Sequence, residues 1–215
     1  MARRRTDMII DTRTKLLVAG RRAFATKGYA EASMDDLTAE AGLTRGALYH
    51  HFGDKKGLLR AVIAQIDAEM TVRLSAIAHA ADTVWGGFID ECVAWIEMAL
   101  EPEIQRIMLL DGPAVLGDPS QWPGQNACVR TTTRSLQLLI EEGTVRQVDP
   151  EATARLINGA ALSASLWIAG ADDPQAVSRK AIDGFLALAS GLLKDGALTK
   201  HAGGTSPTGV ERHRT

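Results

Sequence analysis

Gly42 separates two short segments whose lengths and apolar patterns suit a pair of packed helices. The first, 33–41, begins with a hydroxyl residue followed three positions later by an acid, which is a capping signature for a helix start. The second, 44–52, begins with Thr44, another favoured N-cap residue. Apolar residues in the two segments are spaced to share one small core: Leu37, Ala41, Leu43, Leu48 and Phe52. Two short helices joined by such a turn predict a helix-turn-helix unit.

The second of these helices carries side chains that suit a nucleic acid duplex. Arg45 has a planar fork that can donate twice to guanine O6 and N7, or can bind a phosphate instead. Thr44 adds a hydroxyl and the free N–H groups of a helix start, which attract phosphate. The residues that we expect at DNA are Ser33, Thr44, Arg45, Gly46, Tyr49, His50, His51 and Lys55. Two alternatives stay open: an αα-hairpin that is merely polar on its surface, and packing of His51 inside the protein.

Charge is divided unevenly along the chain. Residues 1–60 contain 12 Lys and Arg against 7 Asp and Glu, whereas the remaining residues contain 12 against 19, and the whole chain has a net charge of −2. We call residues 1–60 the head and the remaining residues the body. A basic head on an acidic body indicates that the head alone contacts a polyanion. The triplet Arg3-Arg4-Arg5 could extend that contact into a minor groove, or it could simply be solvated.

Helical periodicity continues through the rest of the chain. Aromatic residues make up only 5% of it, while Ala and Leu, which are strong helix formers, recur throughout. Apolar residues repeat at helical spacing in the ranges 12–27, 55–80, 84–100, 103–110, 126–142, 150–169 and 174–193. No segment alternates convincingly like a strand, so we predict an all-α fold of about nine helices.

Several protein classes are disfavoured by features that the sequence lacks. The first residues include no apolar segment of a secretory signal, and the longest uncharged run, 156–171, is too short to span a bilayer. Cys92 and Cys128 form no CxxC pair and have no histidine at ligand spacing, so we expect no metal and no cofactor. A Gly-rich phosphate loop, a nucleophile elbow and an HExxH pair are all missing, which argues against an enzyme. We expect a cytoplasmic protein that does not contact a membrane.

Residues 12–60 resemble the DNA-binding domain of the TetR family of transcriptional regulators. The run from Ala41 to Phe52 matches the signature of that family almost residue for residue. Three flanking elements match as well: Asp54-Lys55, Leu58-Leu59 and Phe24-x-x-x-Gly28-Tyr29. Thr38 departs from the pattern, because the family usually has Ala there, and we expect its hydroxyl to turn outward.

The resemblance implies a homodimer that binds an operator of inverted symmetry, with repression that a small-molecule effector relieves. An activator, or a regulator that works through a protein partner, fits the same residues, because the sign of regulation depends on where the operator lies. The expected organisation is a flexible basic arm at 1–10, a helix-turn-helix DNA-binding domain at 11–54, a helical ligand-binding and dimerisation domain at 55–195, and a disordered tail at 196–215.

The last two predicted helices are the expected dimer interface. The helix at 150–169 is apolar on more than one face, so more than one side must be covered. Small residues along it would let a partner helix approach closely. The residues assigned to the interface are Leu156, Gly159, Ala160, Ser163, Trp167, Ile182, Phe185 and Leu186. The alternative is that both helices belong only to the core of one subunit.

An effector pocket is expected around the predicted helix at 84–100. Three of the four Trp residues lie between positions 85 and 122 in a chain that is otherwise poor in aromatic residues. Aromatic side chains and Met commonly line apolar pockets. The residues assigned to the pocket are Trp85, Phe88, Cys92, Trp95, Met98, Met108, Leu116 and Trp122. A stripe of this kind also suits plain core, and the ligand would be apolar or a cation that stacks on aromatic rings.

Overall fold

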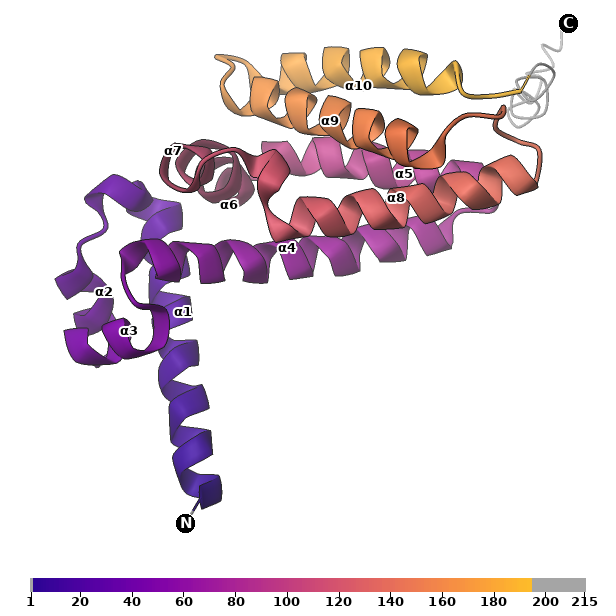
Figure 1. The fold of residues 1–215 in the computed structure, drawn as a ribbon. Helices are drawn as coiled ribbons and strands as arrows, with labels where there is room; N and C mark the ends of the chain where they lie inside the picture. Colours follow the sequence, from indigo (N-terminus) through magenta and orange to yellow (C-terminus); the bar gives the residue numbers. More distant parts are fainter. Residues whose placement is uncertain (1, 195–215) are drawn as a thin grey trace, which may run out of the picture.

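The computed structural model describes residues 2–194, with side chains from residue 9 onward. Over these residues the secondary structure is helical, apart from one isolated antiparallel bridge between Val145 and Leu193. Figure 1 shows a small head of α1–α3 joined through the long helix α4 to a body that holds α5–α10. The all-α prediction is confirmed. The tail predicted at 196–215 lies outside the described residues.

Three helices form the head: α1 (Ala2–Glu31), α2 (Met34–Glu40) and α3 (Arg45–Phe52). They enclose a core that includes four fully buried side chains, those of Leu16, Phe24, Leu37 and Leu48. The expected shared core of the two short helices is therefore present, with Ala41, Leu43 and Phe52 packed half-buried against it.

Backbone conformation and capping define the ends of the two short helices. Gly42 has φ +65°, a left-handed conformation that costs glycine little and other residues more. Ser33 Oγ accepts a hydrogen bond from the Asp36 N–H at 3.0 Å, and Thr44 Oγ1 accepts one from the Ala47 N–H at 3.3 Å. Both predicted N-caps are thus confirmed, and the turn between them orients α3 across α2.

Helix α1 differs from its prediction at one end and agrees at the other. It already begins at Ala2, whereas we expected a flexible arm at 1–10 and a helix from residue 12. Arg and Met are good helix formers and no proline interrupts these residues, so the backbone continues the helix. At the other end Gly28 has φ +80° and breaks the helical conformation before a last turn to Glu31, as its position after Lys27 predicts.

Thr38 corrects another expectation. Its side chain is only 4% exposed, so the hydroxyl does not turn outward. It donates instead to the carbonyls of Met34 and Asp35 one turn earlier, at 3.0 and 3.2 Å. A threonine hydroxyl inside a helix can make its hydrogen bond to the preceding turn, and this offsets the cost of burying the hydroxyl on the inner side of α2.

Helix α4 (Lys55–Ala80) connects the head to the body. Asp54 caps its start by accepting the Gly57 N–H at 2.6 Å. Its apolar stripe is buried on both sides of the junction: Leu58, Leu59, Val62, Ile66, Met70 and Leu74. One continuous helix therefore contributes side chains to the cores of both the head and the body.

The body is built from longer helices around a short irregular stretch. The longer ones are α5 (Val84–Glu97), α8 (Pro123–Glu141), α9 (Pro150–Ala169) and α10 (Pro174–Ser190). The stretch between α5 and α8 contains η1 (Met98–Leu100), α6 (Pro102–Ile104), η2 (Gln105–Asp111), α7 (Gly112–Leu116) and η3 (Pro119–Gln121). The segment predicted as one helix at 103–110 is largely the π-helix η2, a conformation that often occurs at functional sites. In Figure 1, α10 lies along the outer side of α9.

Candidate nucleic-acid interface and body pocket

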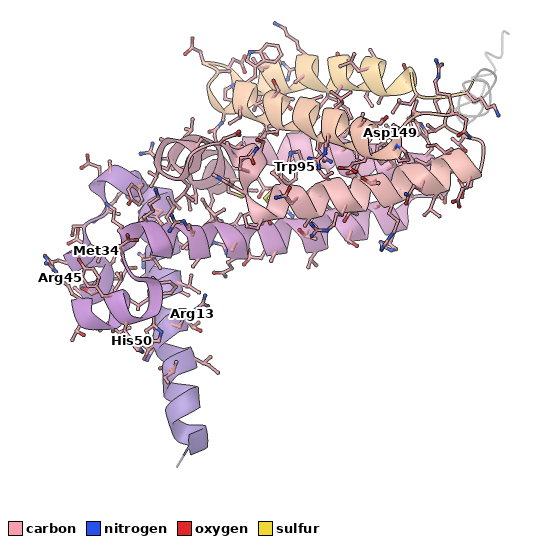
Figure 2. All side chains as sticks on the ribbon, in the orientation of Figure 1. Arg13, Met34, Arg45, His50, Trp95 and Asp149 are labelled. Atoms are coloured by element: carbon pink, nitrogen blue, oxygen red, sulfur yellow. The ribbon has the colours of Figure 1, made fainter. Side chains whose placement is uncertain are left out.

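One exposed face of α3 brings together most of the residues predicted to contact DNA. Thr44, Arg45, Gly46 and His50 are exposed, and Tyr49 keeps 56% of its surface in solvent. Leu48, on the opposite side of the helix, is fully buried and fixes which way α3 is turned. Figure 2 shows Arg45 and His50 at the surface of the head, on the part of the molecule away from the body.

Arg45 has a partner that the sequence reasoning missed. Its Nε and Nη2 both donate to the carboxylate of Asp35, in the first turn of α2. Both side chains are largely exposed, at 60% and 65%. The Arg45 guanidinium holds the pKa of Asp35 below its usual value. In the sequence Asp35 was visible only as the residue before Asp36, which is the acid of the capping signature of α2.

Lys55 is oriented differently from its prediction. Instead of extending toward a flanking phosphate, its Nζ donates to the carbonyl of Ala32 at 2.8 Å and lies 4.3 Å from the ring centroid of Tyr29. The ammonium therefore joins the start of α4 to the corner between α1 and α2. Ser33, by contrast, is exposed beside this corner.

His51 lies at the edge of the exposed face and is half-buried. Its ring is 5.2 Å from that of His50 and 6.2 Å from that of Phe52. Burial, followed by the nearby His50 and Arg13, lowers its pKa. Arg13 of α1 lies 5.3 Å from the centroid of Phe52 and adds an exposed cation beside α3 that the sequence reasoning did not include.

The body contains a cavity of about 320 Å³ beside α4, η2 and the start of α8. Four of the eight residues predicted for a pocket line it: Trp95, Met108, Leu116 and Trp122. Figure 2 shows Trp95 inside the body, between its long helices. Helix α4 contributes Arg60, Ile63 and Asp67 to the lining, and these three residues were not predicted.

The other four predicted pocket residues lie outside the lining of this cavity. Trp85, Phe88 and Met98 are buried in the core, where the rings of Trp85 and Phe88 pack 5.8 Å apart. Cys92 is half-buried, and burial raises the pKa of its thiol to about 12. Helix α5 is covered on more than one side, so only the side that carries Trp95 reaches the cavity.

Asp67 is the acidic residue of the cavity lining. Burial raises the pKa of its carboxyl, and no neighbouring charge among the described residues offsets this effect. The carboxylate packs closely against Gly124 at the start of α8, where a Cβ atom would overlap it. The only sequence signal for Asp67 was its position beside Ile66 on the apolar stripe of α4, which is weak.

An apolar surface follows α9 and α10. Leu156 is 75% exposed and Trp167 is 54% exposed, and Gly159 and Ser163 lie between them at helical spacing. We call this set, with the exposed Leu186 of α10, the α9–α10 face. Ala160 and Ile182 are half-buried at its border. Phe185 is only 4% exposed and belongs to the subunit's own core, so its side chain is not available to a partner.

Two groups of polar contacts join the head to the body. Arg21 of α1 donates to Glu69 of α4 and to both carboxylate oxygens of Glu103, each at 2.7 Å. Farther along α1, the guanidinium of Arg106 in η2 fills the space where Gly28 has no side chain, and a Cβ atom there would overlap it. The head is therefore fixed to the same irregular stretch that lines the cavity.

Two family models cover most of the chain. Residues 16–62 match the model of bacterial regulatory proteins of the tetR family, and residues 85–192 match the tetracyclin repressor-like C-terminal domain. Among curated proteins, the transcriptional repressor AcnR of Corynebacterium glutamicum is 30% identical over 105 residues. That match covers 49% of this chain and 55% of the relative, so the chain spans about half of the relative's length.

Solved structures are similar over nearly the whole described chain. A TetR-family transcriptional regulator from Pectobacterium atrosepticum is 51% identical, with a TM-score of 0.82, over 87% of this chain and 96% of the other. The complex of SmeT with triclosan is 23% identical, with a TM-score of 0.63, over 94% and 99% of the two chains, which is a similarity of fold. Within residues 2–194, no helix combines the length and the hydropathy needed to cross a bilayer.

Proposed function

Because the chain belongs to the TetR family of bacterial transcriptional regulators, we propose that it is a homodimeric repressor whose operator binding is relieved by a small molecule. The observation that carries this proposal is the exposed face of α3, where Thr44, Arg45 and Tyr49 lie together on a capped helix. A helix presented in this way can enter a major groove with its first residues at the base edges. The target of the proposed repressor is genomic DNA, so the protein acts in the cytoplasm.

The α9–α10 face supports the homodimer. A leucine and a tryptophan that expose more than half of their surface in one stripe leave apolar area that a second copy would remove from water. Gly159 has open space around the position of a Cβ atom, so a partner helix can approach there. Paired subunits would present two copies of α3, roughly 34–36 Å apart, to successive turns of one duplex. An operator of inverted symmetry follows from that two-fold arrangement.

The cavity supports the effector. Its volume of about 320 Å³ suits a small organic molecule, and its Trp and Met lining suits an apolar, aromatic one. Asp67 favours an effector that also has a cationic nitrogen, because such a group would offset the cost of holding the carboxylate out of water. SmeT, a protein with the same fold, has a solved structure as a complex with triclosan.

The coupling between effector and operator runs through α4 and η2. Both elements line the cavity, and both contact α1 through Glu69 and Arg106. An effector that fits one arrangement of these helices better than another shifts the population toward it and changes the distance between the two recognition helices. The operator affinity would then fall by the coupling free energy, typically about 1–3 kcal/mol.

Footprinting of the purified protein on the DNA that flanks its own gene tests the proposal. We expect protection of an inverted repeat, with two protected halves about one helical turn apart. Arg45→Ala should weaken binding to that site, while Arg134→Ala, which changes an exposed arginine of α8 in the body, should not. Failure of the protein to bind any duplex at low ionic strength would overturn the proposal.

A further inference from the structure

We propose that Asp35 is a positioning residue that fixes Arg45 for a guanine and so contributes to sequence specificity. The proposal rests on the proposed function, because it assumes that the face of α3 meets DNA. Its basis is the contact in which one carboxylate of α2 accepts hydrogen bonds from both Nε and Nη2 of Arg45.

The chemistry of the guanidinium explains why this contact assists base recognition. Arginine has five N–H groups in a rigid planar fork. The Asp35 carboxylate occupies the side of that fork formed by Nε and Nη2. One N–H of Nη2 and both N–H groups of Nη1 are left, and the end of the fork holds two parallel donors. Those two donors match guanine O6 and N7, so the contact restrains the side chain without using the edge that would bind the base.

The charge of Asp35 works in the same direction. A free arginine at the surface can swing to any nearby phosphate, which strengthens binding to every sequence equally. Arg45 beside a carboxylate is partly neutralised, and the carboxylate itself is repelled by phosphate. The strength of the directional hydrogen bonds from Arg45 to a guanine is unchanged. Asp35 therefore lowers affinity for random DNA relative to the correct site, which raises specificity.

Asp36 provides a matched control on the same turn of α2. It is also exposed and also lies at the helix start, so its removal changes the local charge in the same way. Its carboxylate lies 3.5 Å from Nζ of Lys27 and makes no described contact with Arg45. Effects on phosphate repulsion or on the helix start should thus be shared by Asp35→Asn and Asp36→Asn, whereas an effect through Arg45 should belong to the first alone.

The experiment begins with selection of preferred duplexes from a randomised library by the full-length protein. Selection with Arg45→Ala identifies the base pair at which preference for guanine is lost. Fluorescence anisotropy then gives the affinity of each variant for the selected duplex, for the duplex changed at that base pair, and for a mixed-sequence duplex. Thermal unfolding of each variant shows that it is folded.

We expect Asp35→Asn and Asp35→Ala to reduce the preference at that same base pair by about fivefold or more. Binding to the mixed-sequence duplex should be unchanged or tighter. Asp35→Glu should recover part of the preference, and Asp36→Asn should keep all of it. In the Arg45→Ala background, Asp35→Ala should cause no further loss, because the two residues act as one unit.

Three results would overturn the inference and leave the proposed function intact. The first is full preference in Asp35→Asn at the base pair that Arg45→Ala affects. The second is a loss at a different base pair, which would mean that Asp35 accepts a hydrogen bond from a cytosine itself. The third is an Arg45→Ala variant with unchanged preference at every position. If no duplex is selected at all, the proposed function fails instead.

Discussion

The backbone N–H of Tyr29 donates a 2.7 Å hydrogen bond to Oδ2 of Asp111, and this bond joins the end of α1 to the end of η2. The same carboxylate oxygen lies 3.4 Å from Nε of Arg106. Two residues in the middle of η2, Met108 and Leu109, line the cavity. A single short π-helix therefore contacts both the space for an effector and the head that would bind DNA.

Asp111→Ala should weaken the junction between head and body. The variant loses a hydrogen bond from Tyr29 and an ion pair with Arg106, and the Asp111 carboxylate is only 19% exposed. We expect the free energy of unfolding to fall by about 1.5–3 kcal/mol, the usual contribution of a hydrogen bond to a charged group. Urea unfolding measures this change. Asp90→Ala, on an exposed position of α5, should cost much less, and equal losses in the two variants would contradict the assignment.

Lys55→Met should destabilise the protein without changing how its DNA binding depends on salt. The ammonium binds the Ala32 carbonyl and the Tyr29 ring, so its loss should lower the free energy of unfolding by about 1–2 kcal/mol. Lys180→Met, on the surface of α10, is the control for stability. The slope of log affinity against log salt should be that of the unmodified protein. A slope whose magnitude is smaller by about 0.9 per subunit in Lys55→Met would mean that Lys55 binds a phosphate.

Asp67→Asn should make the protein more stable than the unmodified protein at neutral pH, and this gain in stability should shrink as the pH falls. Burial raises the pKa of Asp67 in the folded state above the ordinary value of 3.8, so the folded state binds its proton more tightly than the unfolded state does. Stability contributed by the protonated acid is therefore lost as the pH rises from 3.8 through the folded-state pKa. The variant has no such loss, so its higher melting temperature at pH 7 should converge on that of the unmodified protein near pH 4.

Two further measurements accompany this prediction. The control is Asp82→Asn, which removes a carboxylate at an exposed position just beyond α4. A panel of aromatic amines and their neutral isosteres is added to the unmodified protein and to Asp67→Asn. The cationic compounds should raise the melting temperature of Asp67→Asn less than that of the unmodified protein, whereas the neutral compounds should raise both equally. The proposal of a cationic effector is wrong if Asp67→Asn reduces the stabilisation by neutral and by cationic compounds to the same extent.

Leu156→Glu should separate the subunits of the proposed dimer. The change places a charge on the most exposed large apolar side chain of the α9–α10 face, twice in each dimer. We expect the dissociation constant of the dimer to rise by about tenfold or more, because an interfacial leucine contributes about 1.5–3 kcal/mol when buried. Analytical ultracentrifugation gives the mass directly. Leu138→Glu on α8, where the leucine is 48% exposed, is the control, and dissociation of both variants alike would contradict the assigned face.

Local signals in the sequence were enough to predict the head. The N-caps at Ser33 and Thr44 and the left-handed turn at Gly42 depend on residues only a few positions apart, so composition and spacing determine them. The start of α1 was harder, because the sequence from Ala2 onward has helical propensity but no periodic apolar face.

The site was predictable only where one helix determines it. The face of α3 follows from the helical period once Leu48 is inside, but the partner of Arg45 comes from another helix, and so does the carbonyl that binds Lys55. The pocket depends on the conformation of η2 and on the approach of α4 to α8, which no local pattern encodes. Trp95, which was expected at the pocket, does lie in the cavity lining, whereas Asp67 was missed.

The missing side chain at Gly28 limits how the sequence of this protein can evolve. The Arg106 guanidinium occupies a slot that exists only because one methyl group is missing from α1. A larger residue at position 28 would push α1 away from η2, and in the proposed dimer it would alter the angle at which each copy of α3 reaches its groove. In the proposed regulator, new effector preferences can therefore arise by exchanging cavity residues such as Leu116 while Gly28 and Arg106 are kept.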